Sequence, residues 1–225
     1  MERAMLSQAM EDYLKAIYKL HERSEQVPTM ALAELLKVAP ASVTNMCKKL
    51  AELNLLEYEP YQGVKFTPTG KKLALEIVRH HRLLELYLAE ALNVPWDRVH
   101  EEAEKLEHVL SEDLEERMAA ALGDPLFDPH GAPIPSRSGA ISAQRGGRLV
   151  DMRAGDRLVV VEVDDHDPEL LRYLGKLGLY PGTHVHLLAC APFDGPLTLN
   201  IGPEQHNLGY HAAKAILVVV QQEDQ

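Results

Sequence analysis

The stretch RHHRLLELYLAEALNVPWDRVHEEAEKLEHVLS, residues 79–111, organises the chain. Its periodicity predicts two helices, separated where Asn-Val-Pro-Trp interrupts the pattern at residues 93–96. Histidines and acidic residues recur at helical spacing, on the first helix at His81 and Glu85 and on the second at His100, Glu104, Glu107 and His108. Residues three, four, seven and eight apart share one helix face, so the sequence predicts two clusters of imidazoles and carboxylates.

These clusters have an ordinary alternative, because a lone His or Glu on a helix usually faces solvent. Here apolar residues recur at the same spacing, at Val99, Ala103, Leu106 and Leu110, so the acids flank an apolar stripe instead of opposing it. Carboxylates beside a core need a partner or a cation. Oxygen and imidazole donors without a thiolate suit divalent ions such as manganese and iron. Spacing alone leaves both alternatives open.

The length and charge of the chain restrict the classes of protein to which it can belong. With 225 residues the chain is long enough for more than one domain, and its net charge of −11 argues against a general nucleic-acid coat. The charge is uneven: residues 1–72 hold 10 Lys/Arg against 9 Asp/Glu, whereas residues 73–122 hold 5 against 12. The front can therefore carry a local basic surface, and the acidic middle is where a cation is expected.

Two cysteines, Cys47 and Cys190, give neither a disulfide framework nor a Cys-rich zinc pattern. The start of the chain lacks the apolar core of a secretory signal. The apolar run at residues 215–220 is too short to cross a bilayer. We therefore expect a cytoplasmic protein without a membrane partner.

The chain before the central stretch has the pattern of a winged helix-turn-helix. Helices are predicted from Ser7 to about Glu22, over 30–37 and over 41–53, and Pro40 is compatible with the first turn of the third helix. Short strands at 55–59 and 64–67 flank Pro-Tyr-Gln-Gly, which predicts a hairpin. Two helices joined by a tight turn form the DNA-binding signature, and the hairpin would be its wing.

The third of these helices offers candidate DNA contacts. Small polar side chains early in it can reach base edges, while lysines further along can meet phosphates. The candidates are Ser42, Thr44 and Asn45 for bases, and Lys48, Lys49 and the wing residue Lys65 for phosphates. The alternative is an interaction module that binds no DNA.

The rest of the chain changes character. Residues 124–147 are rich in proline and glycine, which predicts a flexible linker in which His130 is solvated. Strand patterns at 156–163, 184–188 and 215–220, with one helix at 167–178, predict a small β-barrel. The expected fold is mainly α with a small β part. Its domains are 1–72 (DNA binding), 73–123 (helical, metal binding and dimerisation), 124–147 (linker) and 148–225 (barrel).

Together these pieces resemble the diphtheria toxin repressor family of metal-dependent transcriptional repressors, over essentially the whole chain. The resemblance rests on MEDYLKAIYKL (10–20), HRLLE (81–85), VHEEAEKLEHVLS (99–111) and ELLRYLGKLGLYPG (169–182), with the winged helix-turn-helix between them. The barrel is similar to the family's FeoA-like domain, which is of Src-homology-three type. The order and spacing of the motifs are more specific than any one of them.

The resemblance implies two metal sites per chain. The primary ligands would be Asp12, Glu104, Glu107 and His108, and the ancillary ligands would be His81, Glu85 and His100 with an acidic residue from the barrel. At the positions of Asp12 and Glu104 the iron-responsive branch has Met and Cys. The manganese-responsive branch is similar to this chain at both positions. Lys15 stands where one manganese-responsive member has Glu, which argues against a closely spaced dinuclear cluster. Asp167 is our expected barrel ligand, and its alternative role is to cap a helix.

We therefore expect a metal-dependent repressor of metal homeostasis genes, with Mn(II) as cofactor and Fe(II) as the alternative. A homodimer would bind a near-palindromic double-stranded DNA operator through an interface that includes Val99, Leu106, Leu110 and Leu114. A di-metal carboxylate enzyme is one rival, but it needs paired Glu-x-x-His motifs and the chain offers Glu-Lys-Leu-Glu-His once. An adaptor that binds metal and no DNA is the other. No catalytic residues are expected.

Overall fold

A computed structural model of the chain describes residues 6–21, 24–142 and 146–221. The expected helix end at Glu22, the linker residues 143–145 and the last four residues lie outside this description. The described residues form two compact units. One comprises the chain up to His81 with 106–111 and 135–140, and the other comprises 82–105, 112–134 and the residues from 141 onward.

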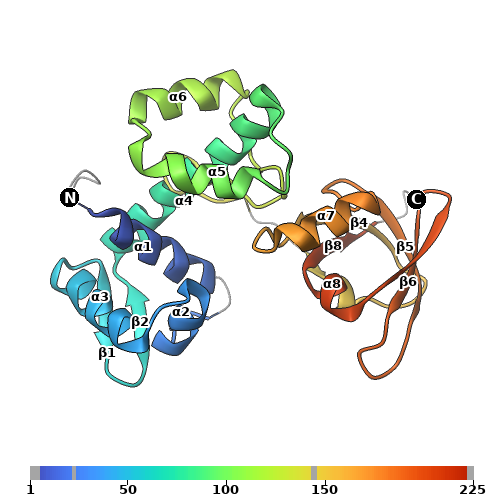
Figure 1. Ribbon diagram of the computed structural model, residues 1–225, viewed down its shortest axis with the longest axis horizontal. Coiled ribbons are helices and arrows are strands. Elements are labelled where there is room, and N and C mark those ends of the chain that lie inside the picture. Colours follow the sequence, from blue (N-terminus) through green and yellow to red (C-terminus); the bar gives the residue numbers. More distant parts are fainter. Residues whose placement is uncertain (1–5, 22–23, 143–145, 222–225) are drawn as a thin grey trace. The chain divides into compact units, whose positions relative to one another are not determined.

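The first unit contains the winged helix-turn-helix, coloured blue to cyan in Figure 1. Its elements are α1 (Gln8–His21), α2 (Thr29–Leu36), α3 (Pro40–Glu52), β1 (Leu56–Glu59) and β2 (Gly63–Phe66), after which α4 (Pro68–Leu92) begins. Lys37, in the left-handed region with φ 53°, ends α2, and Pro40 starts α3. Leu14, Ile17 and Leu50 are fully buried between the helices, where each contributes roughly 1.5–3 kcal/mol by leaving water. The predicted winged helix is confirmed.

The wing is attached to the body by a close backbone approach. Val27 and Val64 exchange two backbone hydrogen bonds of 2.9 Å. Gly63 adopts φ +110°, and a Cβ there would lie 2.2 Å from the carbonyl oxygen of Val27. Only glycine combines this conformation with this contact, so Gly63 sets where the hairpin leaves the domain. Tyr61 lies fully exposed in the turn of the hairpin.

The central stretch differs from the prediction at one point. Instead of one continuous second helix, α5 (Val99–Leu106) gives way to a 3₁₀ turn, η2 (Glu107–Val109), and α6 (Glu112–Ala121) follows. A 3₁₀ turn rotates successive residues by more than an α-helix does. Glu107 and His108 therefore lie in a 3₁₀ turn and not in the α-helix that carries His100 and Glu104.

Residues 124–142 contain no helix or strand, as expected, but they are not a plain solvated linker. Asp128, His130 and Ile134 are buried. The Nη1 atom of Arg79 donates to the carbonyl of Pro135 at 2.8 Å, and that of Arg82 donates to the carbonyl of Pro133 at 2.6 Å. The expectation that His130 is solvated is wrong.

The C-terminal part is the predicted small barrel, drawn in orange and red in Figure 1. Its elements are β3 (Gly147–Arg148), η3 (Leu149–Asp151), β4 (Arg157–Val163), α7 (Pro168–Lys176), β5 (His184–Cys190), β6 (Leu197–Ile201), β7 (Glu204–Leu208), α8 (Tyr210–Lys214) and β8 (Ile216–Val220). The six strands pair antiparallel in the order β3-β8-β4-β5-β6-β7. Leu158, Val185 and Leu199 point into a core closed by Leu171 and Leu174 of α7. Among the described residues, no helix has the length and apolar character needed to span a membrane.

Candidate metal centre

The first cluster lies where α1 meets the 3₁₀ turn η2, around the His108 ring. Its Nδ1 atom lies 2.7 Å from Glu11 Oε2, while Nε2 lies 3.1 Å from Asp12 Oδ1 and 3.6 Å from Glu107 Oε1. An ionised carboxylate only accepts hydrogen bonds, so the short contact to Glu11 places the proton of a neutral ring on Nδ1. The lone pair of Nε2 then faces the oxygens of Asp12 and Glu107.

Asp12, Glu107 and His108 each bring one donor atom to this place, and these atoms lie within 4.8 Å of one another. Their lone pairs repel one another. Oxygen lone pairs around an imidazole lone pair are stabilised by a cation that all three can share. The donor set therefore fits a divalent ion, and it contains no sulfur.

Glu107 is the most deeply buried carboxylate of this cluster. It contacts the Nδ1 atom of His81, and Lys15 Nζ lies 2.6 Å from its Oε1. Burial opposes its ionisation, but the hydrogen bond and charge of His81, together with the Lys15 ammonium, outweigh burial and lower the pKa of Glu107 to about 2. Glu107 is thus held as a carboxylate, which is the form that binds a metal.

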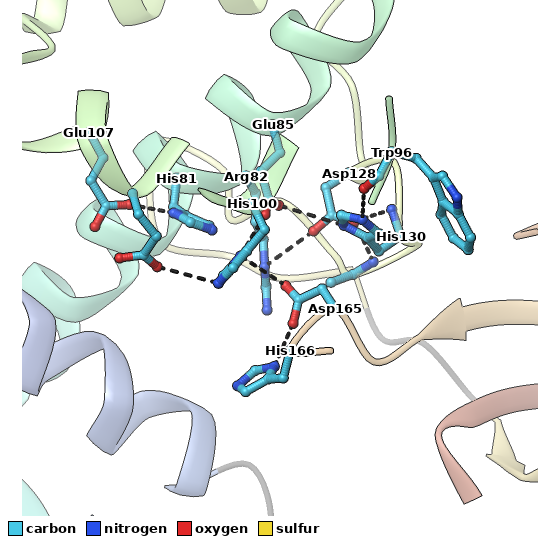
Figure 2. Close-up of polar contacts among 12 residues, drawn as sticks. His81, Arg82, Glu85, Trp96, His100, Glu107, Asp128, His130, Asp165 and His166 are labelled. Atoms are coloured by element: carbon cyan, nitrogen blue, oxygen red, sulfur yellow. Dashed lines mark hydrogen bonds and ion pairs between the residues drawn. The ribbon is translucent and has the colours of Figure 1, made fainter. Parts of the chain in front are cut away.

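The second cluster belongs to the other unit and centres on Glu85 of α4 (Figure 2). Glu85 is fully buried, and its Oε1 lies 2.9 Å from His100 Nδ1. Asp165, from the chain after β4, places its Oδ2 3.5 Å from the same nitrogen. The other ring nitrogen of His100 lies 3.5 Å from Glu104 Oε1.

Asp128 and His130, which the sequence pattern did not indicate as ligands, complete this cluster (Figure 2). His130 Nε2 donates to the Trp96 carbonyl at 2.7 Å, so its Nδ1 presents a lone pair, 4.0 Å from Glu85 Oε2. Asp128 Oδ1 accepts from the backbone N–H groups of His130 and Ala132. Within the described residues, neither Asp128 Oδ2 nor His130 Nδ1 makes a hydrogen bond.

The electrostatics of this buried group also call for a cation. Burial, and then the charge of Glu85, raise the pKa of Asp128 well above its usual value, while Arg82 opposes the shift from 3.7 Å. Glu85, Asp128 and His130 offer one ligand atom each within 4.8 Å, and so do Glu85, His100 and Asp165. The two oxygens of Glu85 face the two halves of the cluster.

Three further candidate ligands, Glu104, His81 and Asp167, make other contacts. Glu104 lies beside His100, and His81 lies beside Glu107. Asp167 accepts from the backbone N–H groups of Glu169 and Leu170 and caps α7, which is its alternative role. Asp165, two residues earlier, is the barrel acid that reaches His100. The spacing Asp-Pro-His in 128–130 was the available signal for the missed pair.

The candidate DNA contacts lie on the outer side of α3 and on the wing. Ser42, Asn45, Lys48 and Lys49 are exposed, and Thr44 and Lys65 are half-buried. Val43, Cys47 and Leu50 alternate with them and face the core. The polar side of α3 is therefore accessible to a partner along its length. A winged helix-turn-helix in the same chain as buried carboxylate and imidazole clusters defines the class: a metal-responsive DNA-binding regulator.

Comparison with known proteins gives the family. Residues 5–64 match the iron-dependent repressor N-terminal DNA-binding domain, residues 67–136 match its metal-binding and dimerisation domain, and residues 147–220 match the FeoA domain. The chain belongs to the diphtheria toxin repressor family of metal-dependent transcriptional repressors.

Three relatives illustrate the likeness. The iron-dependent repressor IdeR of Mycobacterium bovis is 31% identical over 221 residues, which cover 92% of this chain and 95% of IdeR. The diphtheria toxin repressor of Corynebacterium jeikeium is 32% identical over 202 residues, with coverage of 80% and 84%. A structure of a manganese-dependent transcriptional repressor in complex with manganese superposes with a TM-score of 0.89 at 38% identity, covering 94% of this chain and all of that one.

Proposed function

We propose that this metal-dependent repressor responds to Mn(II) through two metal sites per chain and controls genes of metal homeostasis. The observation that carries the choice of metal is the donor set around His108 Nε2, which consists of carboxylate oxygens and contains no sulfur. Hard oxygen donors with imidazole suit manganese, whereas thiolate and thioether donors favour softer metals. Fe(II) shares these preferences in part and is the second candidate.

The proposed first site uses Asp12, Glu107 and His108. The proposed second site uses both oxygens of Glu85, with His100 and Asp165 on one side and Asp128 and His130 on the other. Glu104 and His81 stand at the edges of the two sites, as neighbours of His100 and Glu107. Asp165 takes the place that we had expected for Asp167.

The first site gives a direct route from metal to DNA binding. Asp12 belongs to α1, which packs against α2 and α3 of the DNA-binding domain, whereas Glu107 and His108 belong to η2. Bound metal supplies positive charge that offsets the repulsion between Asp12 and Glu107. Both carboxylates then bind the same ion, which strengthens the attachment of α1 to η2. Metal can shift the protein toward the DNA-competent state only if it binds that state more tightly.

The proposed DNA complex is a twofold dimer on a near-palindromic operator. Leu106 and Val109 are 42% and 75% exposed, and Leu114 is 48% exposed. Val99, which we had placed in the interface, is fully buried and belongs to the core of its own chain. A dimer through Leu106, Val109 and Leu114 would present two copies of α3 to successive major grooves, about 34 Å apart.

Fluorescence anisotropy tests the proposal with operator DNA selected from a random pool by the manganese-loaded protein. We expect Mn(II) to tighten binding strongly, Mg(II) to have little effect, and Glu107→Gln to abolish the response to Mn(II). Glu34→Gln on α2 is the matched control, because Glu34 is exposed and lies in neither cluster. DNA binding that is equal with and without metal would refute metal control, and a response to Fe(II) alone would exclude manganese.

Isothermal titration tests the number of sites. Wild type should bind two Mn(II) ions per chain, whereas Glu85→Gln and Glu107→Gln should each retain one. If wild type bound only one Mn(II) ion, the second site would not exist, and if Glu85→Gln still bound two, Glu85 would not be needed for it.

A further inference from the structure

Two consecutive residues of α1 reach the two nitrogens of a single ring. Glu11 Oε2 lies 2.7 Å from Nδ1 of His108, and Asp12 Oδ1 lies 3.1 Å from Nε2 of the same residue. Glu11 is only 5% exposed, so its carboxylate is largely removed from water and needs hydrogen-bond donors within the protein. The proposed metal set uses Asp12 and leaves Glu11 without a role.

The chemistry of imidazole gives Glu11 that role. A neutral ring carries its proton on either nitrogen, and the hydrogen bond made by one nitrogen decides which of them keeps a lone pair for a metal. An acceptor at Nδ1 keeps the proton there and leaves Nε2 as the donor atom. Carboxylates that act on metal-binding histidines in this way also hold the ring plane in position.

We propose that Glu11 is the positioning residue of the first metal site, because it holds His108 in the tautomer and orientation whose Nε2 lone pair faces Asp12 and Glu107. The inference rests on the proposed metal site and deepens it. Glu11 does not bind the metal itself. Its hydrogen bond also links α1 to η2 without a metal, so Asp12 is held close to its future co-ligands.

The alternative role for Glu11 is that of a direct ligand through its negative charge. The two roles differ in what glutamine does at this position. The side-chain oxygen of a glutamine accepts from Nδ1–H as a carboxylate does, but it carries no charge and is a poor metal ligand. Glu11→Gln should therefore preserve a positioning role and remove a ligand role. Glu11→Ala and Glu11→Leu remove both, and the leucine variant keeps the buried volume so that the helix still packs.

The first measurement reads the tautomer directly and needs no metal. The full-length protein, labelled with ¹⁵N-histidine and treated with chelator, gives ring ¹⁵N shifts that distinguish a protonated nitrogen from one with a lone pair. His108 is identified by the signal that disappears in His108→Gln. We expect Nδ1–H in wild type and Glu11→Gln, and Nε2–H or a mixture in Glu11→Ala and Glu11→Leu. The Nδ1–H form in both Glu11→Ala and Glu11→Leu would overturn the proposal.

The second measurement is Mn(II) affinity by isothermal titration. Removal of a hydrogen-bond partner of a metal-binding histidine typically costs roughly 10- to 100-fold in affinity. We expect that loss at the first site in Glu11→Ala and Glu11→Leu, and an affinity close to wild type in Glu11→Gln. A loss in Glu11→Gln as large as in Glu11→Ala would instead make Glu11 a ligand and overturn the proposal. Glu34→Ala is the control for removal of an acidic residue.

The proposed function and the positioning role of Glu11 can be refuted independently of each other. If wild type bound no Mn(II) at all, the proposed function would fail, whatever the tautomer. If wild type bound two Mn(II) ions, lost one of them in Glu107→Gln, and kept its first-site affinity and its His108 tautomer in Glu11→Leu, the metal site would stand and the positioning role of Glu11 would be excluded.

Discussion

Lys15 places a positive charge among the donors of the first cluster. Its Nζ atom lies 2.6 Å from Glu107 Oε1 and 3.5 Å from His81 Nδ1. Glu11, Asp12 and Glu107 bring three carboxylates to this cluster, so Lys15 and one divalent ion already balance their charge before any charge on His81 is counted. A second divalent ion would leave a positive excess inside the unit. The cluster is therefore suited to a single metal ion.

Replacement of Lys15 by methionine tests this balance. We expect the metal-free protein to lose stability by about 1–3 kcal/mol, because the buried Glu107 carboxylate loses its ammonium partner. We expect Mn(II) affinity to rise by about tenfold, or 1.4 kcal/mol, because a competing positive charge is gone. Thermal melts and titrations of the variant supply both numbers, and Lys72→Met on the exposed side of α4 is the control. Weaker Mn(II) binding in Lys15→Met would show that the ammonium supports the site instead of competing for it.

Asn45 is the residue of α3 that we expect to read a base. Its side chain is exposed and carries both a donor and an acceptor, as recognition of adenine in the major groove requires. Asn45→Ala should cost roughly 1–3 kcal/mol on the selected operator and little on random DNA. Lys48→Ala is the matched comparison, because the loss of a phosphate contact should weaken binding to both DNAs alike. Equal losses of Asn45→Ala on the two DNAs, measured by anisotropy, would exclude base reading.

At the scale of elements, the sequence predicted what depends on local pattern. The helices of the DNA-binding domain followed from apolar spacing and from Pro40, and the hairpin followed from its turn. The break of α5 at Leu106 has no local signal, because Glu107, His108 and Val109 contain neither glycine nor proline. Burial of Glu107, which contacts His81 twenty-six residues away, accompanies the 3₁₀ turn. A contact of that kind leaves no periodic pattern in the sequence.

The second cluster also depends on tertiary contacts that the sequence pattern does not predict. Asp128 and His130 lie in a segment whose prolines and glycines predict a solvated linker. The hydrogen bonds from Arg79 and Arg82 to its carbonyl groups hold this segment close to α4. Burial of the two side chains is thus a product of tertiary structure. The composition of this segment correctly predicted that it forms no helix or strand, but it did not predict whether its side chains are buried.

The start of α7 carries two acids with different expected roles. Asp167 caps the helix, so Asp167→Ala should lower the free energy of unfolding by about 1 kcal/mol and leave Mn(II) stoichiometry unchanged. Asp165 approaches His100, so Asp165→Asn should weaken the second metal site with little effect on stability without metal. Chemical unfolding and isothermal titration of both variants separate the roles. If Asp167→Ala lost a metal ion and Asp165→Asn did not, our original assignment of Asp167 would be restored.

The whole molecule combines an acidic total charge with a DNA-binding domain. The net charge is −11, and residues 1–72 carry almost none of it. Non-specific attraction to DNA is therefore weak, because it depends on an excess of positive charge against phosphates. Two DNA-binding domains that engage their half-sites together supply affinity that one of them lacks. Repression by this chain should accordingly depend on dimerisation.

Val109 is the residue with which to test that dependence, because it is 75% exposed and apolar in the proposed interface. A glutamate there would bury a charge against its twofold copy, so Val109→Glu should make a monomer. The variant should still bind Mn(II) with the stoichiometry of wild type, since Val109 contributes no donor. Its affinity for the selected operator should fall by at least about a hundredfold, toward the non-specific level. Sedimentation, titration and anisotropy measure the three quantities, and Phe193→Glu, a change of the same kind at a fully exposed apolar residue of the barrel, is the control. A monomeric variant that kept the operator affinity of wild type would show that one DNA-binding domain suffices.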